Sequence, residues 1–131
     1  MSEKHNNCRY IFVVVFVSAE AAYIVITKTR CKMNNFETHI QGSLPVVVDF
    51  FADWCGPCKM MPPILKEVKE KTGDRATILK MDVDKNRHYA EKYGIQSIPT
   101  LIIFKGGQII WRKSGVSSAN EILQHLAAHL V

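Results

Sequence analysis

Hydrophobic and polar positions from residue 33 onward fall into short blocks that predict strands alternating with helices. The block at 45–51 is apolar except for Asp49, as is typical of a strand covered on both faces. Two later blocks are separated by Lys105-Gly106-Gly107, a tight hairpin signal. The expected strands are residues 45–51, 76–82, 100–104 and 108–112.

Helical spacing of apolar residues appears between these strands. We expect helices over residues 35–41, 56–71 and 86–93 and after Ser118. Pro62-Pro63 predicts a kink inside the second helix, because proline removes a helix hydrogen bond and clashes with the preceding turn. Ser118 and Glu121 form a capping box ahead of the last helix. The apolar face of that helix is expected to carry Ile122, Leu123, Leu126 and Leu130.

This order of elements predicts an α/β fold. It describes a central mixed sheet of four to five strands with helices on both faces. The chain has 131 residues, which favours one domain, and residues 33–131 contain no repeat, linker or second domain. Residues 33–131 are therefore predicted to be one globular domain, and residues 1–32 an N-terminal extension.

The extension contains an apolar run over residues 10–26, and three interpretations remain open. Arg9, the apolar run and Ala19-Glu20-Ala21 resemble a secretory signal peptide with its cleavage site. A membrane anchor is the second interpretation, but the run is short and contains Glu20. The third is an upstream extension without fold information, the working protein beginning at Met33.

The charge pattern argues against nucleic acid as a main partner. The net charge is +5, and residues 33–131 carry twelve basic against ten acidic groups. Lys66, Lys69 and Lys71 alternate with Glu67 and Glu70, as on a solvated helix face. A nucleic-acid-binding domain would be expected to gather its basic residues on one face.

Cys55 and Cys58 are two of four cysteines and stand in the segment Trp54-Cys55-Gly56-Pro57-Cys58. Two cysteines at this spacing can be a redox pair or half of a zinc site. A strand before the pair and a helix after it favour the redox interpretation, and no second close pair completes a four-ligand zinc site. A thiol at a helix start faces unpaired N–H groups and the positive end of the helix dipole, which favour the nucleophilic thiolate. Cys8 and Cys31 have no motif around them.

Three ordered motifs resemble the thioredoxin family. VVVDFFADWCGPCK, from Val46 to Lys59, is similar to the family's active-site segment. YGIQSIPTLIIFK, from Tyr93 to Lys105, is similar to the segment around its cis-proline, and Ser114-Gly115-Val116 to its glycine loop. The resemblance covers about residues 34–130 and implies the thioredoxin fold.

The resemblance implies roles for four residues. Cys55 would be the exposed attacking thiol and Cys58 the more buried thiol that resolves the mixed disulfide. A carboxylate in an apolar strand is costly without a partner or a task. Asp49 would shuttle a proton to or from the buried cysteine, with a pKa raised by burial. Lys80 is similar to the family's lysine that pairs with this aspartate; otherwise it is a surface residue.

The same resemblance implies a substrate-docking patch. Pro99 would follow a cis peptide bond and present the backbone of Ile98 to an extended substrate segment by strand addition, and it would keep metals away from the dithiol. The apolar docking patch is expected to contain Trp54, Gly56, Pro57, Ile98, Pro99, Gly115 and Val116.

The function implied is reduction of protein disulfides by dithiol exchange. Gly56-Pro57 is similar to reductant thioredoxins, whereas relatives that form or isomerise disulfides usually have histidine in place of Pro57. No metal or organic cofactor is expected; electrons would come from a separate NADPH-dependent thioredoxin reductase. We expect a cytoplasmic monomer. The alternatives are an exported or membrane-tethered protein, with membrane contact only through a retained segment 10–26, and a binding subunit without catalysis.

Overall fold

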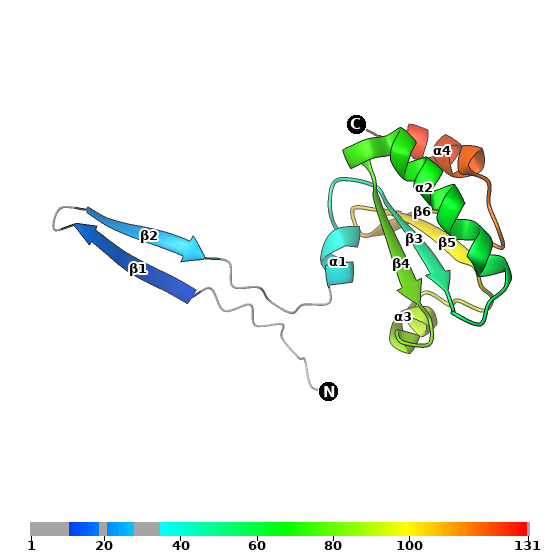
Figure 1. Ribbon diagram of the computed structural model, residues 1–131, viewed down its shortest axis with the longest axis horizontal. Coiled ribbons are helices and arrows are strands. Elements are labelled where there is room, and N and C mark those ends of the chain that lie inside the picture. Colours follow the sequence, from blue (N-terminus) through cyan, green and yellow to red (C-terminus); the bar gives the residue numbers. More distant parts are fainter. Residues whose placement is uncertain (1–10, 19–20, 28–34, 131) are drawn as a thin grey trace. The chain divides into compact units, whose positions relative to one another are not determined.

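The computed structural model describes residues 11–18, 21–27 and 35–130 (Figure 1). The chain divides into two units, Met1–Asn35 and Phe36–Val131, and each is described by itself. Cys8, Cys31 and the expected start at Met33 lie outside the described residues.

The first unit contains an antiparallel pair of strands, β1 (Ile11–Ser18) and β2 (Ala21–Thr27). Ile11 lies opposite Thr27, and Val15 lies opposite Tyr23. The described part of the apolar run is therefore two strands and not a helix. No helix in the described residues is long and apolar enough to cross a membrane. The three interpretations of residues 1–32 remain predictions.

The second unit is built on a four-stranded mixed sheet, as the sequence predicted. Its strands are β3 (Val46–Phe51), β4 (Thr77–Asp82), β5 (Thr100–Lys105) and β6 (Gln108–Ser114). Its helices are α1 (Asn35–Ile40), α2 (Met61–Thr72), α3 (Arg87–Lys92) and α4 (Ala119–Ala127), with 3-10 turns η1 (Pro57–Met60) and η2 (Gly73–Arg75). The strand order is β4-β3-β5-β6; β3 and β4 are parallel, and the other pairs are antiparallel.

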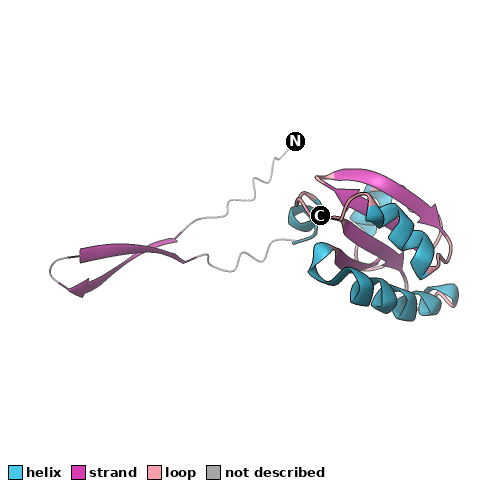
Figure 2. Cartoon of the chain, turned by 90° about the horizontal axis from the view of Figure 1, so that it is seen from above, coloured by secondary structure: helices cyan, strands magenta, loops and turns pink. Residues whose placement is uncertain are grey.

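Helices cover both faces of this sheet (Figures 1 and 2). Side chains of a strand alternate between the two faces, so β3 supplies both cores. Val47 packs with residues of α2 and α4, such as Val68 and Ile122. Val48 and Phe50 pack in the other core with residues of α1 and α3. This explains why β3 is apolar at nearly every position, and it leaves Asp49 as a buried exception.

The second helix differs from the sequence prediction. Residues 56–71 were expected to form one helix kinked at Pro62-Pro63. The structure instead has η1 followed by α2, which begins at Met61 with the prolines in its first turn. Proline is tolerated there because the first N–H groups of a helix have no partner inside the helix. The prolines therefore mark the start of α2.

The capping box of α4 is half formed. Ser118 is the N-cap, and its Oγ accepts a hydrogen bond from the Glu121 N–H at 3.2 Å, as predicted. The Glu121 carboxylate does not reach back; it accepts two hydrogen bonds of 2.7 Å from Lys113 Nζ on β6. A tertiary contact thus replaces the second local one and ties α4 to the edge of the sheet.

Candidate active site

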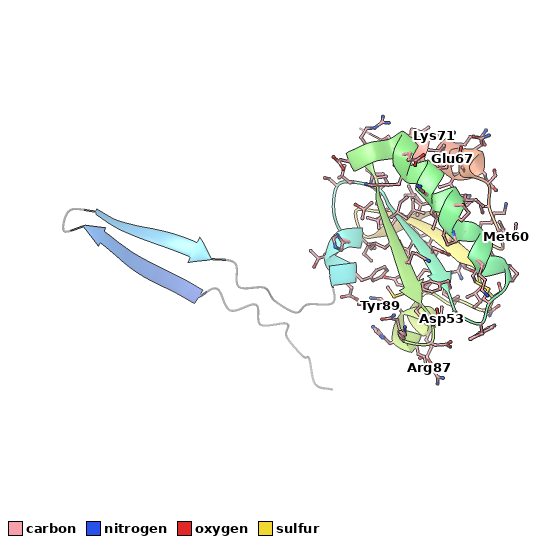
Figure 3. All side chains as sticks on the ribbon, in the orientation of Figure 1. Asp53, Met60, Glu67, Lys71, Arg87 and Tyr89 are labelled. Atoms are coloured by element: carbon pink, nitrogen blue, oxygen red, sulfur yellow. A yellow bond between two sulfur atoms is a disulfide. The ribbon has the colours of Figure 1, made fainter. Side chains whose placement is uncertain are left out.

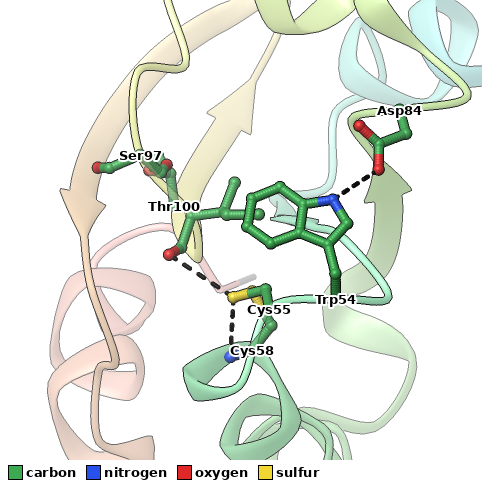
Figure 4. The surroundings of a disulfide bond; sticks show 7 residues. Trp54, Cys55, Cys58, Asp84, Ser97 and Thr100 are labelled. Carbon is green, nitrogen blue, oxygen red and sulfur yellow. Dashed lines mark hydrogen bonds between the residues drawn. A yellow bond between two sulfur atoms is a disulfide. The ribbon is translucent and has the colours of Figure 1, made fainter.

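Cys55 and Cys58 are joined by a disulfide just beyond the end of β3 (Figure 4). Their Cα atoms are 5.4 Å apart. Cys58 lies within η1, and its N–H donates to Cys55 Sγ at 3.2 Å. An N–H group directed at a sulfur stabilises negative charge on it, so this arrangement favours a thiolate at Cys55 once the disulfide is reduced.

One expectation about the cysteines is wrong for this oxidised state. Cys55 was expected to be exposed and Cys58 more buried. The exposed fractions are 4% for Cys55 and 5% for Cys58, so the two are equally covered. Both pack with Ala52, and Phe51, Val83 and Ile98 border the cluster. The disulfide holds both sulfurs against this cluster, whereas the neighbouring Gly56 and Pro57 are exposed.

The loop before β5 reaches the disulfide from the other side. The Ile98–Pro99 peptide bond is cis, as expected. The carbonyl oxygen of Ile98 lies 3.7 Å from Cys55 Sγ. The Pro99 carbonyl accepts a hydrogen bond of 2.8 Å from the Gly115 N–H, so the predicted glycine loop directly supports this segment. Gly115 has φ +90°, a conformation that a residue with a Cβ rarely adopts.

Trp54 is the most exposed apolar side chain of the site, at 73%. Its indole N–H donates to Asp84 Oδ2 at 2.9 Å (Figure 4). No local sequence pattern marks Asp84 as a partner of Trp54, because the two positions are thirty apart in the chain. The hydrogen bond fixes an exposed ring beside Cys55.

A groove of about 460 Å³ begins at Trp54 and Ile98 and continues to α3, whose Arg87 and Tyr89 are marked in Figure 3. It is lined by Trp54, Val83, Asp84, Arg87, Ala90, Glu91, Ile95, Gln96, Ser97 and Ile98. Among the described residues, no backbone hydrogen bond reaches the N–H or C=O of Ile98. The backbone groups of Ile98 are therefore free to pair where this residue borders the groove next to the disulfide.

Asp49 is fully buried, and neither carboxylate oxygen has a hydrogen-bond partner among the residues that the structure describes. Burial raises the pKa of this carboxyl from its ordinary value of 3.8 to about 6, while the positive charge of Lys80 acts in the opposite direction. A carboxyl with such a pKa can both bind and release a proton near neutral pH.

Lys80 lies beside Asp49 without a direct ion pair. The two residues are partners in the parallel register of β3 and β4. The Lys80 ammonium lies over the Phe51 ring, 4.5 Å from its centre, and both Asp49 oxygens remain unbonded. The expected pairing is thus a longer-range electrostatic effect. Lys80 and Cys58 both line a cavity of about 160 Å³.

The residues of the expected docking patch lie in three environments: the groove, the exposed surface beside the disulfide, and the edge of the core. Trp54 and Ile98 line the groove, and Gly56 and Pro57 are exposed beside the disulfide. Val116 is partly buried and packs against the core that α2 and α4 cover.

Across the described segments, no three His, Cys, Asp or Glu side chains lie close enough together to hold a metal ion.

Comparison with known proteins decides the family. The family model described as Thioredoxin matches residues 27–128. The chain belongs to the thioredoxin family. It is 46% identical over 93 residues to a thioredoxin from Alicyclobacillus acidocaldarius subsp. acidocaldarius, covering 71% of this chain and 89% of that protein. It is 46% identical over 114 residues to the chloroplastic thioredoxin Y of Oryza sativa subsp. japonica, covering 86% of this chain and 68% of that protein.

A solved structure agrees with the fold. A mutant thioredoxin from Halobacterium salinarum NRC-1 superposes with a TM-score of 0.67 at 30% identity, covering 73% of this chain and 83% of that one. Family membership and the Cys55–Cys58 disulfide make this protein a thiol-disulfide oxidoreductase that reduces protein disulfides.

Proposed function

We propose that Cys55 attacks and Cys58 resolves. In the reduced protein the Cys55 thiolate would attack one sulfur of a substrate disulfide. A mixed disulfide forms, and the second substrate sulfur leaves as a thiolate that takes up a proton. The hydrogen bond from Cys58 N–H to Cys55 Sγ supports this assignment, because it stabilises the attacking thiolate and not the resolving one.

Cys58 then completes the exchange. Its thiolate attacks Cys55 Sγ, which breaks the mixed disulfide; the substrate sulfur that was bonded to Cys55 leaves as a thiolate and takes up a proton. Two electrons pass to the substrate, and the protein is left with the Cys55–Cys58 disulfide. The Cα separation of 5.4 Å fits this step, since it lies within the ordinary range for a disulfide and requires no large backbone movement.

Asp49 is proposed as the group that takes the proton from Cys58 before the resolving attack. A buried thiol ionises poorly, so it needs a nearby base. Support comes from the unpartnered carboxylate and its pKa of about 6. Lys80 tunes this base by its charge, and the small cavity that it shares with Cys58 provides room for water.

Substrate is proposed to bind as an added strand along Ile98. The unpaired backbone groups of Ile98 can pair with an extended segment whose cysteine then meets Cys55. Trp54 offers an exposed, oriented ring on the same side, and the groove beside it can receive neighbouring substrate side chains. Gly56, Pro57, Pro99, Gly115 and Val116 complete or support this docking surface.

Electrons are proposed to come from a separate NADPH-dependent thioredoxin reductase, with no resident cofactor. The reduced Cys55/Cys58 dithiol itself carries the two electrons, and a reductase would regenerate it by reducing the disulfide at the same surface that binds substrate. We place the protein in the cytoplasm as a monomer that supports redox homeostasis. Export, or tethering through residues 10–26, is the alternative, and the mass of the mature native protein distinguishes them.

The observation that carries the proposal is the Cys55–Cys58 disulfide with its N–H donor on Cys55. Cys55→Ser should abolish reduction of a protein disulfide such as insulin, measured with dithiothreitol or a reductase as electron donor. Cys58→Ser should retain attack and accumulate a mixed disulfide that is visible by mass on non-reducing gels. Accumulation in Cys55→Ser instead would reverse the roles. Full activity in both variants would refute the redox function and favour a binding subunit.

A further inference from the structure

Arg112 joins the edge of the sheet to the segment that carries Ile98. Its guanidinium donates to the carbonyl oxygen of Tyr93 at 2.6 Å through Nη1 and to that of Gly94 at 2.7 Å through Nη2. A planar fork that holds two successive carbonyls fixes direction as well as distance. Arg112 thus fixes the backbone where α3 ends.

The N–H groups of this turn already bond within α3: those of Tyr93, Gly94 and Ile95 donate to the carbonyls of Tyr89, Glu91 and Ala90. Within the described part of the chain, no backbone N–H donates to the carbonyl of Tyr93 or of Gly94. Gly94 has φ +59°, so the chain turns there before it runs to Ile98. Terminal carbonyls of a helix need donors, and an arginine can supply them. The two carbonyls that follow α3 are therefore held by a side chain from β6, while the helix end itself is closed by backbone bonds.

The register of the sheet explains why this residue reaches α3. Arg112 lies opposite Ile102 on β5, and cross-strand partners point to the same face. Ile102 belongs to the core that contains Phe36 of α1 and Tyr89 of α3. Arg112 is therefore on the face covered by α3, while the adjacent Lys113 bonds Glu121 of α4.

We propose that Arg112 is a positioning residue for substrate binding. By fixing Tyr93 and Gly94 it sets the path of Ile95–Ile98, which forms one wall of the groove and presents the backbone of Ile98 beside Cys55. The inference rests on the proposed binding of substrate along Ile98. It concerns extended protein substrates, because a small disulfide needs only the exposed sulfur and no pairing with this backbone.

The test compares Arg112→Ala with Lys113→Ala, a matched loss of a basic side chain from the other face of the same strand. For insulin reduction we expect Arg112→Ala to raise KM about fivefold with kcat nearly unchanged, less than the direct loss of charge-assisted hydrogen bonds because Arg112 acts through the backbone. Its rate with a small aromatic disulfide should stay within about twofold of the native rate. Arg112→Lys should recover part of the KM loss. Amide exchange at Gly94 and Ile95, whose N–H groups bond to α3, should quicken only in the Arg112 variants.

Equal slowing with both disulfides, or no KM change relative to Lys113→Ala, would overturn the inference. Should Arg112→Ala not fold, Arg112→Gln answers the same question, because its amide is uncharged and its side chain is shorter than that of arginine. Cys55→Ser, assayed in parallel, separates the two proposals. If Cys55→Ser is inactive and Arg112→Ala has the native KM for insulin, only the positioning role is refuted. If Cys55→Ser is active, the proposed function itself is refuted.

Discussion

The indole N–H of Trp54 donates a hydrogen bond to Asp84 at 2.9 Å, across thirty residues of sequence. Trp54 is 73% exposed and directly precedes Cys55, so this single bond holds a large apolar ring in place at the surface. Asp84 follows β4, and its own N–H donates to Asp82 Oδ1 at 2.9 Å, which fixes the acceptor. The turn after β4 thereby orients a docking residue that follows β3.

We predict that Asp84→Ala lowers kcat/KM for insulin about threefold, because the Trp54 ring loses its fixed orientation, and one such bond contributes about 1 kcal/mol. The chain has two tryptophans, so a Trp111→Phe background reports Trp54 alone. In that background the fluorescence anisotropy of Trp54 should fall. Asp74→Ala, which changes a fully exposed carboxylate, serves as the control. An unchanged anisotropy would show that the hydrogen bond does not orient the ring.

Asp49→Asn should stabilise the oxidised protein at neutral pH. The folded pKa of about 6 lies above the ordinary 3.8, so the folded state holds the proton more tightly. The stability of the native protein should therefore fall as the pH rises from about 4 to about 6, by about 3 kcal/mol in total. The neutral amide avoids this loss. Urea unfolding at pH 4 and pH 7.5 should show a gap between variant and native protein that widens with pH.

The same substitution should slow insulin reduction at pH 7, since the proposed proton acceptor for Cys58 is lost. Asp74→Asn should alter neither stability nor rate. A pH-independent gap in stability would show that Asp49 ionises normally in the folded protein. An unchanged rate would remove its role in proton transfer while leaving the stability argument intact.

Lys80→Met should raise the pKa of Asp49 further above its ordinary value, because the lysine charge is what opposes the effect of burial. The pH at which the reduction rate is half-maximal should move upward relative to the native protein. Lys85→Met, which changes a lysine paired with Asp82, is the matched control. A profile that stays in place would mean that the Lys80 ammonium over the Phe51 ring does not influence Asp49.

Leu126→Ala should lower the free energy of unfolding by about 2–5 kcal/mol, because its side chain is fully buried between α4 and the sheet. Leu44→Ala makes the same chemical change at a residue that is 39% exposed and should cost much less, within about 1 kcal/mol. Urea unfolding of both variants measures the difference. Equal losses would show that α4 is not packed as the structure describes.

The pattern of residues was sufficient for the order of the elements and for the chemistry. Strands over 45–51 and 100–104, the helix after Ser118 and the hairpin at Gly106-Gly107 follow from local spacing, and the structure contains them all. The spacing of Cys55 and Cys58 allows a redox pair or half of a zinc site; the flanking strand and helix favour the redox pair, and the resemblance to thioredoxins implies the role of each cysteine. Asp49 stands out by its place in an apolar strand. These features are local because periodicity and turn residues act over only a few positions.

Long-range contacts leave no such local pattern in the sequence. Two hydrogen-bonded contacts join separate elements: Trp54 with Asp84, and Arg112 with the carbonyls of Tyr93 and Gly94. No spacing of residues in the sequence predicts either contact. The equal burial of the two sulfurs and the shift of α2 to begin at Met61 also depend on packing. Only the tertiary structure decides such features, because burial and pairing depend on which side chains the folded sheet brings together.

The sequence by itself therefore determined a redox dithiol at the end of a strand. The tertiary structure decided what surrounds it: an N–H aimed at Cys55 Sγ, the Ile98 carbonyl 3.7 Å away, and a carboxyl whose pKa burial raises to about 6. The physical reason is that the sequence itself specifies which residues are cysteines and how far apart they stand in the chain. A thiol's reactivity and its access to substrate are set by desolvation and by groups that arrive from distant segments.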